Sequence, residues 1–283
     1  MVPRDSDMAG PMKYAIPLAV ALLFLPITSH ADAPTQLTER AQEAAPTEDV
    51  TNWSLTGGFV LNTGNTQSWT VTTGTNLQII RGPHAFLLES AFNMSRADIR
   101  DDGQPYLTNA RNWNSRVRYD YFITPLDAAY VSIRHRWDTF AGLETRLQNQ
   151  IGYLRNFFRA DNHRFWGEVG YDLTYDNLWP DPLIDPVTLM PLDGTVFVHA
   201  GRIFLGYSNH LNEHVLFETG GEALFNFQVG KDIRFNYDAR LVSQLAKRLE
   251  LELRFRLLFD NVPVPGNRSL DTTTTANLIV TLI

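Results

Sequence analysis

The chain contains no cysteine. This absence excludes disulfide bonds, thiol catalysis, thiolate metal sites and a lipid-modified N-terminal cysteine, but it leaves the cellular compartment open. A surplus of basic residues is also absent, since the 283 residues carry a formal net charge of -7. Because contacts to phosphate need grouped lysines and arginines, the composition predicts that the chain has no nucleic-acid partner.

Long apolar runs are scarce. No segment has the roughly 18 consecutive apolar residues that a membrane-spanning helix needs. The first apolar run, Tyr14–Ile27, is too short to span a bilayer and contains two prolines. Lys13 precedes it and the small-residue sequence Ser29–Ala33 follows it. This pattern predicts a signal peptide over residues 1–31, cleaved after Ala31 or Ala33, with an N-terminal membrane anchor as the alternative.

The sequence leaves the start of translation open among Met1, Met8 and Met12. Residues 32–52 are rich in Ala, Pro, Thr and Glu, a composition that is typical of a flexible segment. We therefore expect a flexible N-terminal tail in the periplasm.

Catalytic motifs are missing as well. The chain has no H-x-S, G-x-S-x-G or H-E-x-x-H sequence, and these arrangements would mark nucleophilic or zinc-dependent hydrolases. His135 shares the parity of apolar neighbours that we expect to face outward, and His199 has no nucleophile and acid clustered with it. The sequence therefore predicts no enzyme, no cofactor and no metal site.

The chain does contain a repeated alternation of apolar and polar residues. It is clearest in Leu249–Asp260, LELELRFRLLFD, where leucines and phenylalanines occupy one face and charged residues occupy the other. Such a period of two predicts β-strands. About twelve segments share it: 53–62, 67–80, 85–97, 109–122, 129–138, 145–157, 164–176, 195–207, 214–228, 232–246, 249–260 and 272–283.

The connections between these segments differ in length. The long ones, 97–108, 177–194 and 261–271, all fall at odd-numbered connections, and the even-numbered connections are short. An up-and-down meander with long loops at one end and short turns at the other produces this alternation, as outer-membrane barrels do. We predict that residues 53–283 form one all-β, up-and-down transmembrane β-barrel of about 12 antiparallel strands, of the outer-membrane type. A soluble sandwich or a lipocalin-like barrel is the rival fold.

Aromatic residues near the strand ends favour lipid outside the barrel, because they resemble the interfacial girdles of membrane barrels. These residues are Trp53, Trp69, Trp113, Tyr121, Tyr130, Trp137, Tyr153, Phe157, Tyr175, Tyr207, Phe227 and Phe259. The printed sequence ends on an expected strand, whose last residue is Ile283 rather than the aromatic residue usual in outer-membrane barrels.

Charged residues of both signs occupy the polar faces, which we expect to line the lumen. They are Arg116, Arg118, Asp120, Arg134, Arg136, Glu168, Asp172, Glu218, Glu222, Arg234, Asp238, Arg240, Glu250, Glu252, Arg254 and Arg256. Twelve strands lie between the eight that leave room only for side chains and the sixteen that leave a channel. Two hypotheses remain open: an ion-pair network that fills a narrow barrel, or a small polar pore.

The first hairpin contains the sequence Leu61–Trp69. Pairing Leu61 with Trp69 keeps both apolar faces on one side and requires a loop with an odd number of residues. The expected turn is therefore Gly64-Asn65-Thr66.

That turn, together with Arg118–Phe122 and Arg136–Leu143, resembles the YdiY-like, salt-stress-induced outer-membrane proteins, a bacterial family of unknown function. The resemblance covers nearly all of 53–283. It implies a Gram-negative outer-membrane barrel and supplies no catalytic residues.

We therefore expect a non-enzymatic barrel with a structural or envelope-stress role. A narrow channel for ions or small polar solutes is the alternative, and an outer-membrane hydrolase ranks third. The expected partners are outer-membrane lipid, lipopolysaccharide and the barrel-assembly machinery, while the sequence leaves the oligomeric state open.

Overall fold

The structure is a computed structural model that describes residues 49–62, 67–98, 107–138, 143–160, 162–178, 183–184, 191–263 and 268–282. The predicted signal peptide, most of the predicted tail and the turn Gly64-Asn65-Thr66 lie outside these ranges. No helix in the described ranges is long and apolar enough to cross a membrane.

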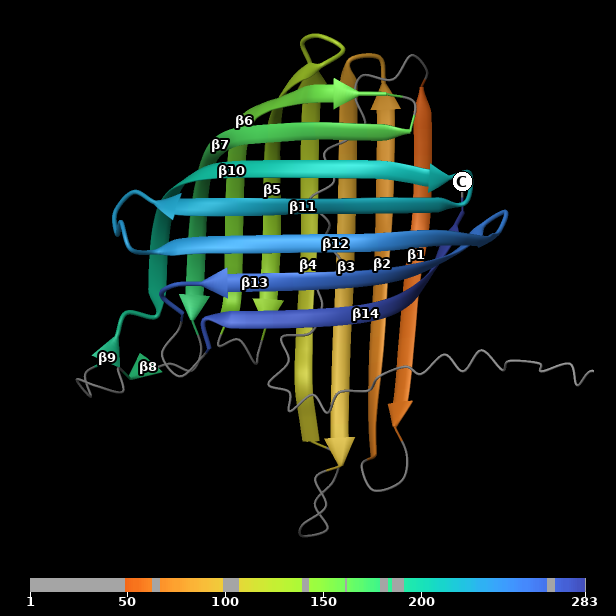
Figure 1. The fold of residues 1–283 in the computed structure, drawn as a ribbon. Helices are drawn as coiled ribbons and strands as arrows, with labels where there is room; N and C mark the ends of the chain where they lie inside the picture. Colours follow the sequence, from red (N-terminus) through yellow and green to blue (C-terminus); the bar gives the residue numbers. More distant parts are fainter. Residues whose placement is uncertain are drawn as a thin grey trace, which may run out of the picture.

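Twelve antiparallel strands form a closed barrel in which each strand pairs with its neighbours in chain order and the last strand pairs with the first (Figure 1). The strands are β1 (Val50–Asn62), β2 (Gln67–Arg81), β3 (His84–Asp98), β4 (Leu107–Phe122), β5 (Asp127–Asp138), β6 (Leu143–Arg159), β7 (His163–Leu178), β10 (Thr195–Asn212), β11 (Val215–Asn226), β12 (Ile233–Ala246), β13 (Leu249–Asp260) and β14 (Leu270–Thr281). Two short strands, β8 (Leu183–Ile184) and β9 (Pro191–Leu192), pair with each other outside the barrel sheet.

The predicted all-β, up-and-down barrel of twelve strands is confirmed, and each predicted segment overlaps one barrel strand. The largest extension is in β10, which continues to Asn212 instead of ending at residue 207. β1 begins at Val50, so its first three residues fall within the predicted tail. The predicted register of the first hairpin is also confirmed, because Leu61 pairs with Trp69 and Phe59 pairs with Val71.

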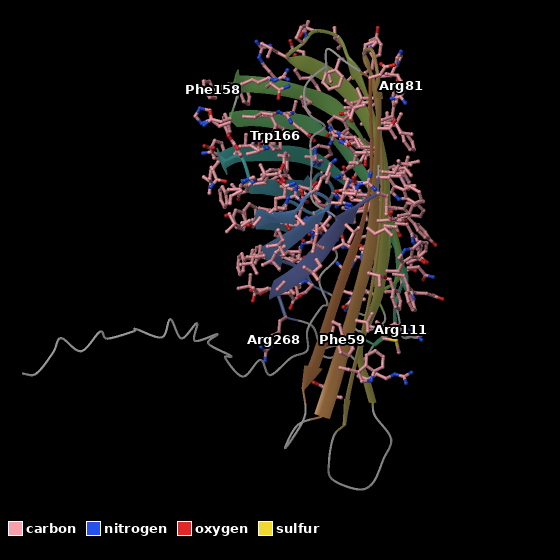
Figure 2. All side chains as sticks on the ribbon, turned by 90° about the vertical axis from the view of Figure 1, so that its right-hand side faces the viewer. Phe59, Arg81, Arg111, Phe158, Trp166 and Arg268 are labelled. Carbon is pink, nitrogen blue, oxygen red and sulfur yellow. The ribbon has the colours of Figure 1, made fainter. Side chains whose placement is uncertain are left out.

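The two ends of the barrel differ in their connections. Short turns, such as Gly82-Pro83 between β2 and β3, lie at the end that also holds the start of β1 and the end of β14. Gly82 has a φ of 54° there, a conformation that favours glycine. We call this end the short-turn end and the opposite one the long-loop end. Figure 2 shows Arg81 near the first and Phe59 near the second.

Apolar and polar residues alternate between the outer and inner faces of the wall. Outward residues such as Ile133 and Leu253 remain 53% and 48% exposed, whereas the inward Arg118 and Arg202 are each 1% exposed. This is the reverse of a soluble protein, in which charged residues are almost never fully buried. In Figure 1 the wall formed by β1–β4 crosses the opposite wall, β11–β14.

Candidate functional site in the barrel lumen

The centre of the lumen contains a chain of alternating charges, which we call the central ion-pair chain: Asp120, Arg118, Glu168, Arg202 and Glu222. Arg118 Nη2 lies 2.7 Å from Asp120 Oδ1 and 3.0 Å from Glu168 Oε1. Arg202 Nη1 lies 2.6 Å from Glu168 Oε2, and its Nε lies 2.5 Å from Glu222 Oε1. Because β4 is not a neighbour of β7 in the sheet, the Arg118–Glu168 contact crosses the lumen.

Tyr130 of β5 completes this centre. Its hydroxyl accepts a hydrogen bond of 2.7 Å from Arg202 Nη1, and the Arg118 guanidinium lies 4.2 Å from the centroid of its ring. Our assignment of Tyr130 to the outer aromatic girdle is therefore wrong. The residue shares the parity of Ala128 and Ser132, which points it into the lumen, where it is 2% exposed.

A second group of ion pairs joins β11, β12 and β13. Arg240 contacts Glu218, and its Nη1 also lies 3.2 Å from Glu252 Oε2. Arg254 and Arg256 share the Asp238 carboxylate, with their Nε atoms 3.6 and 3.5 Å from Oδ2. Two consecutive inward positions of β12 and three of β13 therefore carry a continuous network, which Glu218 extends to β11.

Near the long-loop end, Arg136 bonds Asp138 at 2.8 Å and Arg146 bonds Asp176 at 2.6 Å. Arg234 lies 3.4 Å from the Asp260 carboxylate and 3.8 Å from that of Asp176. Each pair joins two opposite charges, and burying either charge without its partner would cost several kcal/mol of stability, on the order of the penalty for an unpaired buried ion.

The other predicted residues also point inward. Arg116 lies 2.7 Å from Glu89. Asp172 accepts hydrogen bonds from Gln150 at 2.9 Å and from Thr174 at 2.5 Å. Arg134 is within electrostatic reach of Glu222.

Several residues of these networks were absent from the predicted set of lumen residues: Glu89, Tyr130, Asp138, Arg146, Asp176 and Arg202. The alternation alone would have found Arg202, because its neighbours Ile203 and Leu205 point outward at 47% and 50% exposure.

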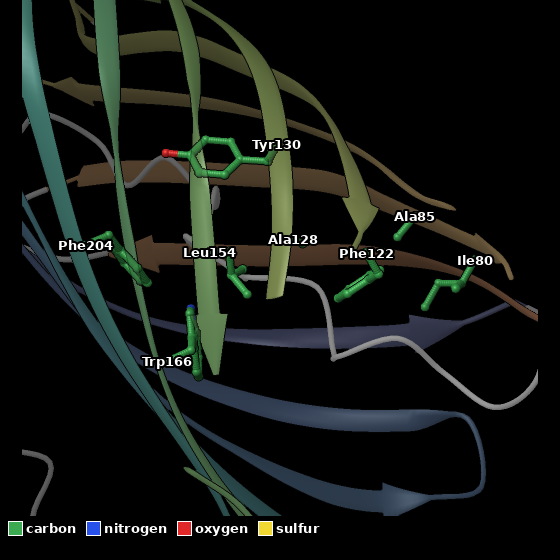
Figure 3. Packing of buried hydrophobic residues seen from close by; sticks show 8 residues of the cluster. All are labelled: Ile80, Ala85, Phe122, Ala128, Tyr130, Leu154, Trp166 and Phe204. Atoms are coloured by element: carbon green, nitrogen blue, oxygen red, sulfur yellow. The ribbon is translucent and has the colours of Figure 1, made fainter. Parts of the chain in front are cut away.

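An apolar cluster fills part of the lumen between the central ion-pair chain and the short-turn end (Figure 3). Its members are Ile80, Ala85, Phe122, Ala128, Tyr130, Leu154, Trp166 and Phe204. The Trp166 ring lies 6.1 Å from that of Phe204 and covers Gly206, where an added Cβ would come within 2.3 Å of the indole. Polar residues therefore do not line the whole interior. An apolar layer separates the central ion-pair chain from the short-turn end.

A cavity of about 410 Å³ lies on the other side of the lumen, between β1–β3 and β11–β14. Its lining is mostly polar and includes Ser54, Gln244, Glu250, Glu252 and Arg254. Within the described residues, no group of three or more His, Cys, Asp or Glu side chains is placed to hold a metal ion.

The fold and the lumen define a class: a closed antiparallel β-barrel with an apolar outer surface and an ion-paired interior. Residues 55–282 match a family described as "Protein of unknown function, DUF481". The chain belongs to this family.

Solved structures with similar folds include a NanC porin, with a TM-score of 0.48, 8% identity and coverage of 82% of this chain and 100% of that one. The translocator domain of autotransporter NalP from Neisseria meningitidis has a TM-score of 0.40, 10% identity and coverage of 83% and 88%. The outer membrane channel DcaP of Acinetobacter baumannii has a TM-score of 0.37, 8% identity and coverage of 86% and 99%. No curated protein matches the sequence significantly.

Proposed function

We propose that this chain is an outer-membrane β-barrel with a structural, non-conducting and non-enzymatic role in the bacterial envelope. The observation that carries the proposal is the central ion-pair chain, whose side chains are at most 1% exposed. Buried and mutually paired charges close the middle of the lumen to water. A barrel closed in this way provides a membrane-embedded wall rather than a solute path.

The outer surface supports a position in the membrane. Strands of membrane barrels alternate apolar residues toward lipid with polar residues toward the lumen. β13 follows this rule, with Leu253 and Phe255 exposed on the outside and Glu252 and Arg254 buried inside. Even strand number and short turns beside both barrel termini support a periplasmic short-turn end, reached after export by the predicted signal peptide.

The resemblance to YdiY-like, salt-stress-induced proteins supports a role when the envelope is under salt stress. Lipid and lipopolysaccharide would then surround the barrel, and the barrel-assembly machinery would insert it. Two histidines on the strands support a non-enzymatic role, because they pack against outward aromatic rings: His135 lies 5.2 Å from Trp113 and His199 lies 6.0 Å from Tyr171.

A narrow channel for ions or small polar solutes is the second candidate, because the polar cavity of about 410 Å³ reaches inward as far as Glu252 and Arg254. Planar-bilayer recording of the refolded barrel separates the two. We expect a baseline current without discrete steps. Reproducible single-channel steps would refute the closed barrel and favour the channel. Incubation with phospholipid should release no fatty acid, and turnover would contradict the non-enzymatic role.

A further inference from the structure

Two exposed arginines lie on the outer face of the barrel near the long-loop end. Arg96 belongs to β3, and Arg111 belongs to the neighbouring β4, where its ladder partner is Met94. Because Met94 and Arg96 are two residues apart on one strand, the two arginines lie on the same face, one diagonal step from each other. Figure 2 shows Arg111 toward the same end as Phe59 and away from Arg81. We call these two residues the outer arginine pair.

Each member of the outer arginine pair lies over an indole ring. Arg96 Cζ is 5.8 Å from the centroid of the Trp69 ring, and Arg111 Cζ is 4.8 Å from that of Trp137. Both distances are within the range of cation–π contacts, which hold a guanidinium against the face of a ring. The N–H groups at the edge of the guanidinium remain available, in the planar arrangement that binds a phosphate through two hydrogen bonds.

The outer arginine pair also lacks a counter-charge in the part of the chain that the structure describes. Neither side chain forms an ion pair or a hydrogen bond there. Two outward arginines nearer the short-turn end differ in this respect. Arg81 Nε lies 3.8 Å from Asp49 Oδ2, and Arg155 Nη1 lies 3.0 Å from Asp127 Oδ1. The outer arginine pair therefore offers two positive charges to an external anion.

The pair lies at the edge of the apolar outer surface. Along β3, the outward residues between His84 and Arg96 are apolar apart from Ser90, whose hydroxyl accepts a 2.8 Å hydrogen bond from the Trp113 indole. With the usual rise per residue and a strand tilt of about 40°, this stretch covers about 30 Å along the barrel axis. The apolar band of membrane barrels is about 25 Å tall. In a membrane, Arg96 therefore meets the headgroup layer rather than the acyl chains.

We propose that the outer arginine pair binds the phosphate groups of lipopolysaccharide. The lipid anchor of this molecule carries phosphate on the sugars to which its acyl chains are attached. Phosphate bound at the two guanidinium groups would therefore leave the acyl chains along the apolar strands below them. The inference rests on the proposed function, in which the long-loop end faces outward, and it adds a specific lipid-binding site to that barrel.

Native mass spectrometry of the full chain in detergent tests the phosphate contact. The probes are lipid A with two phosphate groups and the same lipid A after removal of both. The wild type should retain the phosphorylated form several-fold more than the dephosphorylated form. The double variant Arg96→Gln/Arg111→Gln should lose this preference, whereas the matched control Arg81→Gln/Arg155→Gln, with the same change of charge near the other end, should keep it.

Three results would overturn the proposal: equal retention of the two lipids by the wild type, an unchanged preference in Arg96→Gln/Arg111→Gln, or the same loss in the control. Heat-modifiable gel mobility verifies that each variant is folded. The single variants Arg96→Gln and Arg111→Gln, each with a reduced preference, provide the test if the double variant does not fold.

Labelling in intact cells separates this binding from the proposed orientation. Val262→Cys places a thiol at an exposed position in the connection between β13 and β14, at the long-loop end. It should react with a membrane-impermeant maleimide added outside the cells. Reaction only after permeabilisation would refute the orientation, and with it lipopolysaccharide as the source of the phosphate. Reaction in intact cells without any phosphate preference in detergent would leave the orientation standing and refute the outer arginine pair as a lipid site.

Discussion

Arg202 Nη1 lies 2.6 Å from Glu168 Oε2, and neither side chain is more than 1% exposed. This buried pair is at the centre of a barrel whose outer surface exposes many large aliphatic and aromatic side chains. The contact joins the neighbouring strands β7 and β10 and shows how the interior can hold charges, because they are paired. Through Glu168 the pairing extends to Arg118, whose strand is not a neighbour of β7.

Replacement of Arg202 by alanine should destabilise the barrel strongly. It would leave Glu168 and Glu222 buried without this shared cation, and breaking a buried pair costs about 3–5 kcal/mol. Urea titration of the barrel refolded in detergent, followed by heat-modifiable gel mobility, measures the effect. Arg268→Ala, at an exposed site before β14, should change the free energy of unfolding by less than about 0.5 kcal/mol. Equal midpoints for the two variants would contradict the central ion-pair chain.

Removal of the Tyr130 hydroxyl tests the central ion-pair chain with a smaller structural change. Tyr130→Phe deletes the oxygen that accepts the 2.7 Å bond from Arg202, and hydrogen bonds to charged groups contribute about 1.5–3 kcal/mol. We expect a loss in that range in the same urea titration. Tyr237→Phe is the control, since that ring packs 6.3 Å from Phe255 on the outer face. A Tyr130→Phe variant as stable as the control would place Tyr130 outside the network.

The apolar layer predicts a compensating pair of substitutions. Gly206→Ala would place a methyl group 2.3 Å from the Trp166 ring, and such overpacking costs about 1–3 kcal/mol. Trp166→Leu should open a space that accepts the methyl group. The double variant should therefore lose less stability than the sum of the single losses, as a double-mutant cycle would show. Strictly additive losses would mean that the two residues are not in contact in the folded barrel.

A charge on the outer face should impair insertion. Leu253 is 48% exposed on β13, and an arginine on the lipid face near the bilayer midplane costs about 2–4 kcal/mol. Leu253→Arg should reduce the folded fraction in liposomes, and Leu253→Met should behave as the wild type. Normal folding of the arginine variant would show that this face does not meet lipid.

The strands were predictable from sequence because each one has an apolar outer face and a mostly polar face toward the lumen. Apolar and polar residues, such as Leu253 and Arg254, therefore alternate along the chain. Tyr130 was misassigned because its residue type was given more weight than its parity. Contacts such as Arg118–Glu168 were beyond reach, since their strands are not neighbours and meet only through the curvature of the closed wall. The short β1–β14 ladder, which ends at Gly57↔Leu278, is also a property of closure, and no local pattern encodes it.

Electron paramagnetic resonance of nitroxide labels tests the central claim, that the apolar outer face meets lipid. Single cysteines at Ile133, Ile203 and Leu253 would each carry a label, and the exposed Arg268 position would serve as the aqueous control. In liposomes, the three strand labels should collide often with oxygen, which dissolves in lipid, and rarely with a water-soluble nickel chelate, while the control should show the opposite. Frequent nickel collisions at the three strand positions would contradict the account.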